Sequence, residues 1–268
     1  MKIFISGFVL GLLAFAIQAQ VNGPSSPQPV DAPFSESLQA VVVITKDWEA
    51  VQGVARLYER KTPHSRWKAV GAEFPIVVGR KGLAIGADSP SDLWQKDLTS
   101  LRPLIKHEGD GRAPAGLFPL TYAFGSKSVP TVKLPYTALR ETTECVDDEN
   151  STHYNTVVNR EQVTGVDWKS SEKMLAVGQQ YERGVFVGYN SYPPKAGSGS
   201  CIFLHIWKDS TSGTSGCTAM ERANLERVLA FLDPAKRPYL VQLPAVEYVR
   251  NTKTWKLPNF KIPYPVYP

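Results

Sequence analysis

The apolar positions of the chain predict strands over most of its length. Val41–Thr45 is a β-branched run, and Val54–Tyr58 alternates apolar and polar residues, which is typical of strands with a buried face. Ile76–Val78 and Leu83–Ile85 flank a turn at Lys81–Gly82. This arrangement predicts a hairpin.

Two strong strands and one helix are predicted in the last third of the chain. The strands are expected at 184–189 and 201–207, and the helix follows Cys217. Thr218 and Glu221 have the spacing of a capping box, so we expect Thr218 to be the N-cap. The apolar residues of the helix recur at helical spacing: Leu225, Val228, Leu229 and Leu232. This balance of elements predicts a β-rich α+β fold with few helices.

The first residues have the pattern of a secretory signal peptide, which we assign to 1–19. Lys2 precedes an apolar run that ends at Ala16, and a further small residue follows at Ala19. The alternative, a membrane anchor, needs ~20 apolar residues, and this run is shorter. The Pro-, Ser- and Gly-rich segment 20–37 predicts a flexible linker. We expect an exported protein of the periplasm or cell envelope, with no membrane segment after cleavage.

The remaining chain of about 250 residues fits a single domain. We place this domain at 38–243 and assign 244–268, which is rich in proline and aromatic residues, to a C-terminal tail. The formal net charge is +5, but the Lys and Arg residues are scattered. Export argues against nucleic acid as a partner, so the charge only favours an anionic extracellular partner. The oligomeric state stays open.

One predicted strand presents a histidine opposite its most apolar face. Because successive side chains of a strand point to opposite faces, the strand has two sets of residues. One face holds Ile202, Leu204 and Ile206, and the other holds Cys201, Phe203, His205 and Trp207. The small, polar segment 209–216 can then fold tightly and bring Cys217 back towards His205.

Cys217 is predicted to be a nucleophile and His205 its base. The helix expected after Cys217 would favour the thiolate through its dipole. Backbone N–H groups of the Ser215-Gly216 turn would be free to form an oxyanion hole. Cys201 is excluded, because four positions along a strand put it ~13 Å from His205, far beyond hydrogen-bond reach. A buried structural cysteine beside a satisfied histidine is the alternative.

These residues resemble the signature of the YkuD-type L,D-transpeptidases. That signature combines a strand histidine with a Gly-Cys turn, and an upstream Asp-Gly-x-x-Pro-x-Gly-x-Phe element precedes both. The matching segments are Phe203-Leu204-His205, Ser215-Gly216-Cys217-Thr218-Ala219-Met220 and Asp110-Gly111-Arg112-Ala113-Pro114-Ala115-Gly116-Leu117-Phe118. The resemblance covers 76–243 and implies a single β-sandwich or barrel catalytic domain.

The resemblance also implies a reaction on peptidoglycan stem peptides. Cys217 would attack the L-centre–D-Ala bond of a tetrapeptide stem, and His205 would take the thiol proton. The acyl group would then pass to an amine, with no metal or cofactor implied. The alternatives are an L,D-carboxypeptidase, which passes the acyl group to water, and an inactive cell-wall-binding protein. The acyl acceptor and the stem composition stay open.

The chain departs from better-known members of this family around the cysteine. Many members have His where this chain has Ser215, and Ile-Arg where it has Thr218 and Ala219. The spacing between His205 and Cys217 is also shorter than in those members. These departures indicate a divergent branch.

Three further residues are candidates for substrate binding. Arg112 could bind a substrate carboxylate through bidentate hydrogen bonds, and a solvated loop arginine is the alternative. Tyr154 and Asn155 follow His153 in a polar, aromatic cluster. This cluster could line the stem-peptide cleft, or it could be a surface turn.

The cysteine count predicts one disulfide. Three cysteines in an exported protein leave one unpaired. If Cys217 is the free nucleophile, Cys145 and Cys201 are the pair that an oxidising compartment would join.

Overall fold

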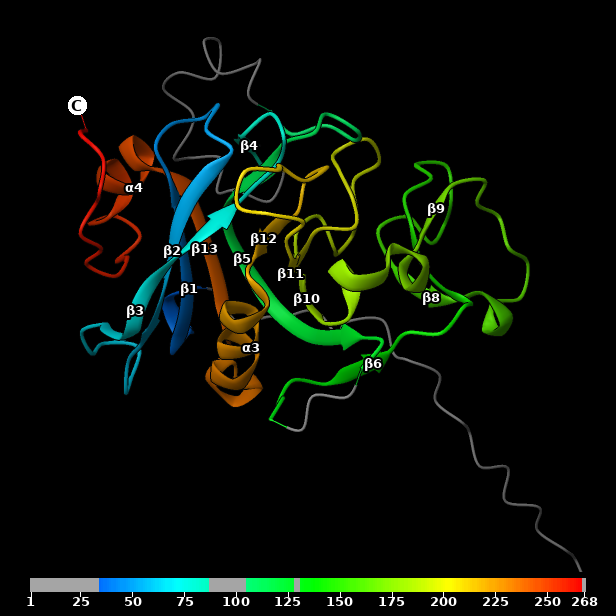
Figure 1. Cartoon of the computed structure of the whole chain (residues 1–268), viewed down its shortest axis with the longest axis horizontal. Coiled ribbons are helices and arrows are strands. Elements are labelled where there is room, and N and C mark those ends of the chain that lie inside the picture. The colour runs from blue at the N-terminus through cyan, green and yellow to red at the C-terminus, as the bar shows by residue number, and fades with distance from the viewer. Residues whose placement is uncertain (1–33, 87–104, 128–130, 267–268) are drawn as a thin grey trace, which may run out of the picture.

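The computed structural model describes residues 34–86, 105–127 and 131–266. The predicted signal peptide (1–19) and the part of the predicted linker before Phe34 lie outside the described residues. Within them, the chain forms a large sheet that closes into a barrel and a small three-stranded sheet beside it (Figure 1). The predicted β-rich fold is confirmed.

The large sheet closes because its longest strand, β5, pairs with both β13 and β10. Around the ring the order is β10, β11, β12, β3, β2, β1, β13 and β5. These strands are β1 (Gln39–Thr45), β2 (Gln52–Glu59), β3 (Lys68–Val77), β5 (Ala113–Gly125), β10 (Gly184–Val187), β11 (Phe203–Ile206), β12 (Thr218–Met220) and β13 (Tyr239–Pro244). Two short strands, β4 (Leu83–Ile85) and β6 (Tyr136–Ala138), pair with β5 outside the ring.

The strand β1 is buried along its whole length. It pairs in parallel with β13 and antiparallel with β2, and helix α4 (Ala245–Asn251) packs against β1 and β13. A strand that is covered on both faces has a continuous apolar sequence. This explains the β-branched run at Val41–Thr45.

The hairpin predicted for residues 76–85 is wrong in its strand pairing. β3 ends at Val77, and β4 pairs in parallel with β5 instead of returning along β3. A tight turn is present, with an antiparallel bridge between Gly79 and Gly82. A Cβ on Gly79 would lie 2.5 Å from the carbonyl oxygen of Gly111. The turn therefore packs against the loop that precedes β5, and β4 continues onto that strand.

Residues 139–183 leave the barrel between β6 and β10, and we call them the insert. The insert holds the small sheet, in the order β8–β7–β9, and two 3₁₀ helices. Its elements are β7 (Thr143–Val146), β8 (Val157–Asn159), η3 (Arg160–Gln162), β9 (Ser171–Lys173) and η4 (Met174–Tyr181). In Figure 1 the strands β8 and β9 lie to the right of the barrel. Helix η4 packs against β11, β5 and β7 and so connects the insert with the ring.

The helix predicted after Cys217 is present, but it begins later than expected. α3 (Arg222–Phe231) has Glu221 as its N-cap residue, without a side-chain capping hydrogen bond. Thr218, the expected N-cap, lies in β12, which pairs with β11 on one side and β3 on the other. Pairing on both edges outweighs the local capping pattern, because a buried strand must satisfy its backbone groups. The predicted apolar face of α3 is buried in the main core: Leu225, Val228, Leu229 and Leu232.

The first described residues are folded onto the barrel, so the predicted linker is wrong for 34–37. η1 (Phe34–Glu36) buries Phe34, whose ring stacks on Trp67 with centroids 5.7 Å apart. The guanidinium of Arg60 donates hydrogen bonds to backbone carbonyls of this segment, including those of Ser35 and Ser37 at 2.6 Å each.

The C-terminal segment also packs on the domain. A short 3₁₀ helix, η5 (Pro234–Lys236), precedes β13, and α4 follows it. After α4, the side chains of Trp255, Leu257 and Phe260 are buried in the main core. Among the described residues, no helix is long and apolar enough to span a bilayer.

Candidate functional site

The strand β11 separates two apolar clusters, as its alternating sequence predicted. Ile202, Leu204 and Ile206 belong to the main core. Phe203 belongs to a smaller cluster with Cys217, to which the insert also contributes. The candidate site lies on the side of the smaller cluster.

A cavity of about 620 Å³ lies between the barrel and the insert. The barrel contributes Cys217 and His205 to its wall, and the insert contributes Glu172 and Tyr181. The polar loops before β5 and before β12 complete the wall. The predicted nucleophile and base therefore line one cavity.

Cys217 directly precedes β12 and is the one cysteine outside the disulfide. Its Sγ accepts a hydrogen bond from the backbone N–H of Phe203 at 3.4 Å. The thiol lies 3.5 Å from the carbonyl oxygen of Cys201, to which it donates. The residue is only 8% exposed, so the backbone next to β11 holds the thiol in place.

His205 lies on the same face of the sheet as Cys217. In the parallel pair of β11 and β12, His205 is opposite Ala219, and Cys217 lies two residues before Ala219. Nδ1 of His205 is 2.8 Å from the carbonyl oxygen of Ile206. Because a carbonyl oxygen only accepts, Nδ1 carries the hydrogen and Nε2 keeps its lone pair. The imidazole is therefore held in the tautomer that a general base needs.

Burial keeps both groups neutral. Burial and the nearby charge of Glu172 raise the pKa of Cys217 to about 12, although the hydrogen bond from the backbone N–H of Phe203 opposes the rise. Burial also lowers the pKa of His205 to about 4. At neutral pH the pair is thus a thiol and a neutral imidazole. The predicted thiolate at a helix N-terminus is wrong, because Cys217 precedes a buried strand instead of α3.

The loop before Cys217 is fixed by the turn between β3 and β4. The N–H of Arg80 donates to the carbonyl oxygen of Thr214 at 2.8 Å, and the N–H of Thr214 donates to that of Val78 at 2.9 Å. A Cβ on Gly213 would lie 2.5 Å from the Cα of Arg80, so the two segments are in direct contact. Thr214 Oγ1 donates to the carbonyl oxygen of Cys217 at 2.6 Å, which fixes the turn into the nucleophile.

Ser215 and Gly216 form this turn, but the free N–H expected for Gly216 is wrong. The N–H of Gly216 donates to Thr214 Oγ1 at 3.1 Å. The exposed Ser215 hydroxyl accepts a hydrogen bond from the Arg80 side chain at 3.3 Å. In this arrangement the N–H of Gly216 is not an open donor for an oxyanion, whereas the Ser215 hydroxyl keeps its own hydrogen to donate.

The structure contains the disulfide between Cys145 and Cys201, with Cα atoms 6.0 Å apart. It joins β7 of the insert to the residues just before β11. The N–H of Cys201 also donates to Asn155 Oδ1 at 2.9 Å. The disulfide leaves Cys217 as the free thiol and ties the insert to the strand of His205.

Tyr154 and Asn155, which were predicted as possible substrate-binding residues, lie outside the lining of this cavity. Asn155 is buried, and its Nδ2 donates to the carbonyl oxygens of Tyr189 and Asn190 at 2.8 and 2.6 Å. The Tyr154 hydroxyl donates to Glu108 at 2.6 Å. Both side chains connect loops of the structure.

Arg112 is likewise engaged within the protein and does not line the cavity. Its guanidinium contacts both carboxylate oxygens of Glu49, at 2.8 and 2.9 Å, and donates to the carbonyl oxygen of Leu83 at 3.0 Å. The bidentate geometry expected for a substrate carboxylate is used on Glu49 instead.

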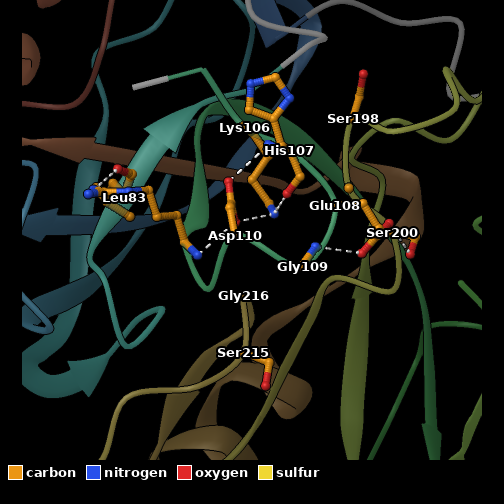
Figure 2. A network of polar contacts seen from close by, with 12 residues as sticks. Leu83, Lys106, His107, Glu108, Gly109, Asp110, Ser198, Ser200, Ser215 and Gly216 are labelled. Atoms are coloured by element: carbon orange, nitrogen blue, oxygen red, sulfur yellow. Dashed lines mark hydrogen bonds and ion pairs between the residues drawn. The ribbon is translucent and has the colours of Figure 1, made fainter. Parts of the chain in front are cut away.

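The Asp-Gly element shapes the cavity wall through its acidic residue (Figure 2). The Nζ of the buried Lys106 lies 2.7 Å from Asp110 Oδ1 and donates to the carbonyl oxygen of His107 at 2.7 Å. Nearby, Glu108 accepts a hydrogen bond from Ser200 Oγ at 2.7 Å. Figure 2 shows these contacts joining the loop before β5 to the loop before β11.

The cavity residues that were not predicted from the sequence include Lys106, Glu172 and Tyr181. Lys106 lies close to the Asp-Gly element, so its place beside the motif was a usable signal. Glu172 and Tyr181 carry no local signal, because only the fold of the insert brings them to Cys217. Within the described residues, no group of three or more His, Cys, Asp or Glu is placed to hold a metal ion.

The comparison with protein families agrees with this geometry. The model of the YkuD family, the L,D-transpeptidase catalytic domain, matches residues 52–243. This range runs from β2 to β13, spans the insert and includes His205 and Cys217. The chain therefore belongs to the YkuD L,D-transpeptidase catalytic domain family. No match to the chain was found among curated proteins.

Proposed function

We propose that the protein is a peptidoglycan L,D-transpeptidase that acts through Cys217 on the L-centre–D-Ala bond of tetrapeptide stems, with His205 as general base. One observation carries the proposal. The free thiol and an imidazole with an available Nε2 share one face of adjacent strands and line one cavity. Membership in the YkuD family supports the class of reaction.

The proposed reaction has two acyl-transfer steps. Sγ of Cys217 attacks the carbonyl carbon of the scissile bond while its proton passes to Nε2 of His205. The C–N bond then breaks, and D-Ala leaves with the proton from His205. In the second step an acceptor amine attacks the thioester and gives its proton to His205. The C–S bond breaks, and the proton returns to Cys217.

The neutral resting state decides how the thiol is activated. Because the pKa of Cys217 is about 12 and that of His205 about 4, an ion pair is unfavourable before substrate binds. Proton transfer is therefore expected to accompany attack, as in general base catalysis. The oxyanion would then form beside two side chains that are little exposed to solvent, where a hydrogen-bond donor acts more strongly than in water.

Low exposure of the site favours an amine over water as acceptor. Cys217 is 8% exposed and His205 5% exposed. A thioester in such a site is shielded from hydrolysis until an acceptor enters. This argues for transpeptidation over L,D-carboxypeptidase activity.

Charges on the cavity wall suit a stem peptide, which carries carboxylates and, in some stems, an amine. The wall has side chains of both signs: Arg80, Lys106, Lys208, Glu108, Asp147 and Glu172. The cationic groups can bind a carboxylate, and the acidic groups can bind an ammonium. This supports a peptide substrate with both kinds of group.

We also propose that the protein works outside the cytoplasm, in the periplasm or cell envelope. The disulfide between Cys145 and Cys201 supports an oxidising compartment, and the expected signal peptide at 1–19 agrees with it. The intact mass of the protein recovered from the cell envelope tests this. A mass that still includes 1–19, or reduced Cys145 and Cys201, would contradict the proposal.

The proposed reaction is tested by mass spectrometry of muropeptides. The mature protein is incubated with tetrapeptide-rich peptidoglycan beside the Cys217→Ala variant. We expect cross-linked dimers that lack one D-Ala, with product in the variant lower by about three orders of magnitude or more. Tripeptides without dimers would indicate an L,D-carboxypeptidase. No Cys217-dependent product with several amine acceptors would favour a cell-wall-binding protein.

A further inference from the structure

A tyrosine of the insert connects the thiol to a carboxyl group. The Tyr181 hydroxyl, at the end of η4, donates to Glu172 Oε1 at 2.9 Å. The Cys217 thiol is a second polar neighbour of this hydroxyl, and both residues pack in the same small apolar cluster. The Tyr181 ring also contacts the imidazole of His205 edge to face, with centroids 5.3 Å apart and planes at 64°. All four side chains line the cavity.

The hydroxyl of Tyr181 has one proton and two neighbours. It can donate that proton to Glu172 or to Cys217, but not to both at once. When the carboxyl group is ionised, it can only accept, so the hydroxyl donates to Glu172. When the carboxyl group is protonated, it can donate to the tyrosine oxygen. The hydroxyl proton is then free to turn towards the sulfur.

We propose that Tyr181 is a catalytic residue that donates a hydrogen bond to the sulfur of Cys217, and that Glu172 is a positioning residue that directs this hydroxyl. The proposal rests on the proposed function, since it concerns the same sulfur. It assigns to the insert a direct part in activating the nucleophile. No bond other than hydrogen bonds forms or breaks in this arrangement.

Glu172 changes its charge near neutral pH, so it can redirect the Tyr181 hydroxyl within the pH range in which the reactivity of Cys217 is measured. Burial raises the pKa of Glu172 to about 7, with the charge of Asp147 adding to the rise and the Tyr181 hydrogen bond opposing it. The ionised carboxylate also raises the pKa of Cys217, whereas the Tyr181 hydrogen bond lowers it. The two residues therefore act on the thiol in opposite directions: Glu172 raises its pKa when the carboxyl group is ionised, and Tyr181 lowers it when the carboxyl group is protonated.

Other charged or titratable groups also face this cavity, and some of them act on Cys217 and Glu172. From the barrel side these are Arg80, Lys106, Glu108, Lys208 and the neutral His205, and from the insert Asp147. Lys106 lowers the pKa of Cys217 through its charge, but it is engaged with Asp110. The pKa of Glu172 is about 7, so its titration is the change expected between pH 6 and pH 8.5.

The test measures alkylation of Cys217 by iodoacetamide under non-reducing conditions. Because the other two cysteines form the disulfide, labelling reports on Cys217 alone and needs no peptidoglycan. The rate constant is followed from pH 5.5 to pH 9, where it is proportional to the small thiolate population. The variants are Tyr181→Phe, Glu172→Gln and the double variant.

The two single variants are expected to move the rate in opposite directions. Tyr181→Phe removes the donor, and we expect alkylation about three- to tenfold slower below about pH 7, where Glu172 is protonated and the hydroxyl can donate to the sulfur. Glu172→Gln removes the charge, so the rate should match the wild type at pH 5.5 and exceed it by about three- to tenfold at pH 8.5. If Glu172 acts through Tyr181, this gain is expected to shrink in the double variant.

Tyr122→Phe is the matched control, because Tyr122 belongs to the same small cluster and is buried, but it does not line the cavity. Its alkylation profile should overlay the wild type. An unchanged profile for Tyr181→Phe would overturn the catalytic role. A Glu172→Gln gain that persists in full in the double variant would overturn the positioning role. If Tyr181→Phe does not fold, Glu172→Gln is a sufficient test by itself. No increase in its alkylation rate at pH 8.5 would overturn the proposal.

The outcome also separates this proposal from the proposed function. The expected alkylation profiles without any muropeptide product would leave Tyr181 and Glu172 in their roles and reject the transpeptidase. Muropeptide product together with unchanged alkylation profiles would support the transpeptidase and reject the roles of Tyr181 and Glu172. In transpeptidation, Tyr181→Phe should lower kcat more than it raises KM, since the hydrogen bond acts on the reacting sulfur.

Discussion

The barrel and the insert meet at Cys217, and different interactions stabilise the two regions. The barrel core consists of fully buried apolar side chains, among them Ile44, Phe118 and Leu204. The insert contributes only some residues of the smaller apolar cluster, and it is organised around a carboxylate, Glu144, that is 2% exposed. One region depends on apolar burial, and the other depends on charge and a disulfide.

The Glu144 carboxylate is the centre of the small sheet. It accepts hydrogen bonds from Trp168 Nε1 at 2.8 Å and Ser171 Oγ at 2.7 Å. It also forms ion pairs with Arg160 and Lys173. Burial opposes ionisation, but the hydrogen bonds of Lys173, Ser171 and Trp168 outweigh it and hold the pKa at about 2.

The two regions contribute different residues to the candidate site. The barrel holds the thiol and the imidazole on adjacent strands, where apolar packing fixes them. The insert brings Tyr181 and Glu172 against them, and its own stability depends on pH and on the Cys145–Cys201 disulfide. We therefore expect conditions that loosen the insert to change the reactivity of Cys217 while the barrel stays folded.

Loss of the disulfide is expected to have the largest effect on this comparison. The bridge spans 56 positions of sequence, and chain entropy for such a loop corresponds to about 4 kcal/mol. In the variant with Cys145→Ala and Cys201→Ala, the free energy of opening of the insert amides should fall by about that amount, so these amides should exchange faster. Amides of the barrel strands should keep most of their protection. Hydrogen exchange with mass spectrometry measures both regions.

Phe118→Ala is the matched control in the barrel. Phe118 is fully buried, and such a change costs about 3–5 kcal/mol of stability. It should lower the protection of both regions, because the insert cannot stay folded without the ring. Equal losses in barrel and insert after removal of the disulfide would contradict the comparison.

The second prediction concerns the pH dependence of the insert. The pKa of Glu144 is about 2 in the folded protein against 4.5 as its ordinary value, so its contribution is complete above about pH 4.5 and is lost towards pH 2. The pKa of Glu172 is raised to about 7, so its contribution is complete below about pH 4.5 and is lost as the pH rises through 7. Each of these two contributions to the free energy of unfolding of the insert amounts to at most about 3 kcal/mol.

Protection of the insert amides, corrected for intrinsic exchange, should thus be highest near pH 4.5, and that of the barrel should change less. Glu144→Gln should reduce the loss of protection below pH 4.5, to which Asp148 and Asp167 also contribute, and Glu172→Gln should remove the loss of protection above pH 4.5. A monotonic profile of the insert from pH 2 to pH 8 would break this part of the comparison.

Features that depend on local geometry could be predicted from the sequence. Alternation along 201–207 was sufficient to place His205 opposite the residues of the main core, and the cysteine count, together with the assignment of Cys217 as the free nucleophile, was sufficient to pair Cys145 with Cys201. The small residues of 209–216 predicted the return of the chain that puts Cys217 beside β11. Each of these needed only the strand period, the cysteine count or the composition of one loop.

Features that depend on distant partners could not be predicted in this way. Thr218 has the sequence of a helix cap, but it pairs with Leu204 of β11, and the rest of β12 pairs with β3 from far earlier in the chain. The guanidinium of Arg112 donates to the carboxylate of Glu49, and no local sequence pattern indicates this contact. Tyr181 and Glu172 reach the thiol only through the fold of the insert.

The smallest effect is expected at the exposed turn on the barrel side. Ser215 stands where many family members have a histidine, and its side chain contacts only the exposed Arg80 among the hydrogen bonds seen in the described residues. Ser215→Ala should therefore change kcat/KM by less than about threefold. Thr214→Val, which removes the hydrogen bonds to Cys217 and Gly216, should lower it by about tenfold. A large loss in Ser215→Ala would mean that a side chain of this loop acts on the substrate. The barrel would then contribute more than backbone geometry to this side of the cavity.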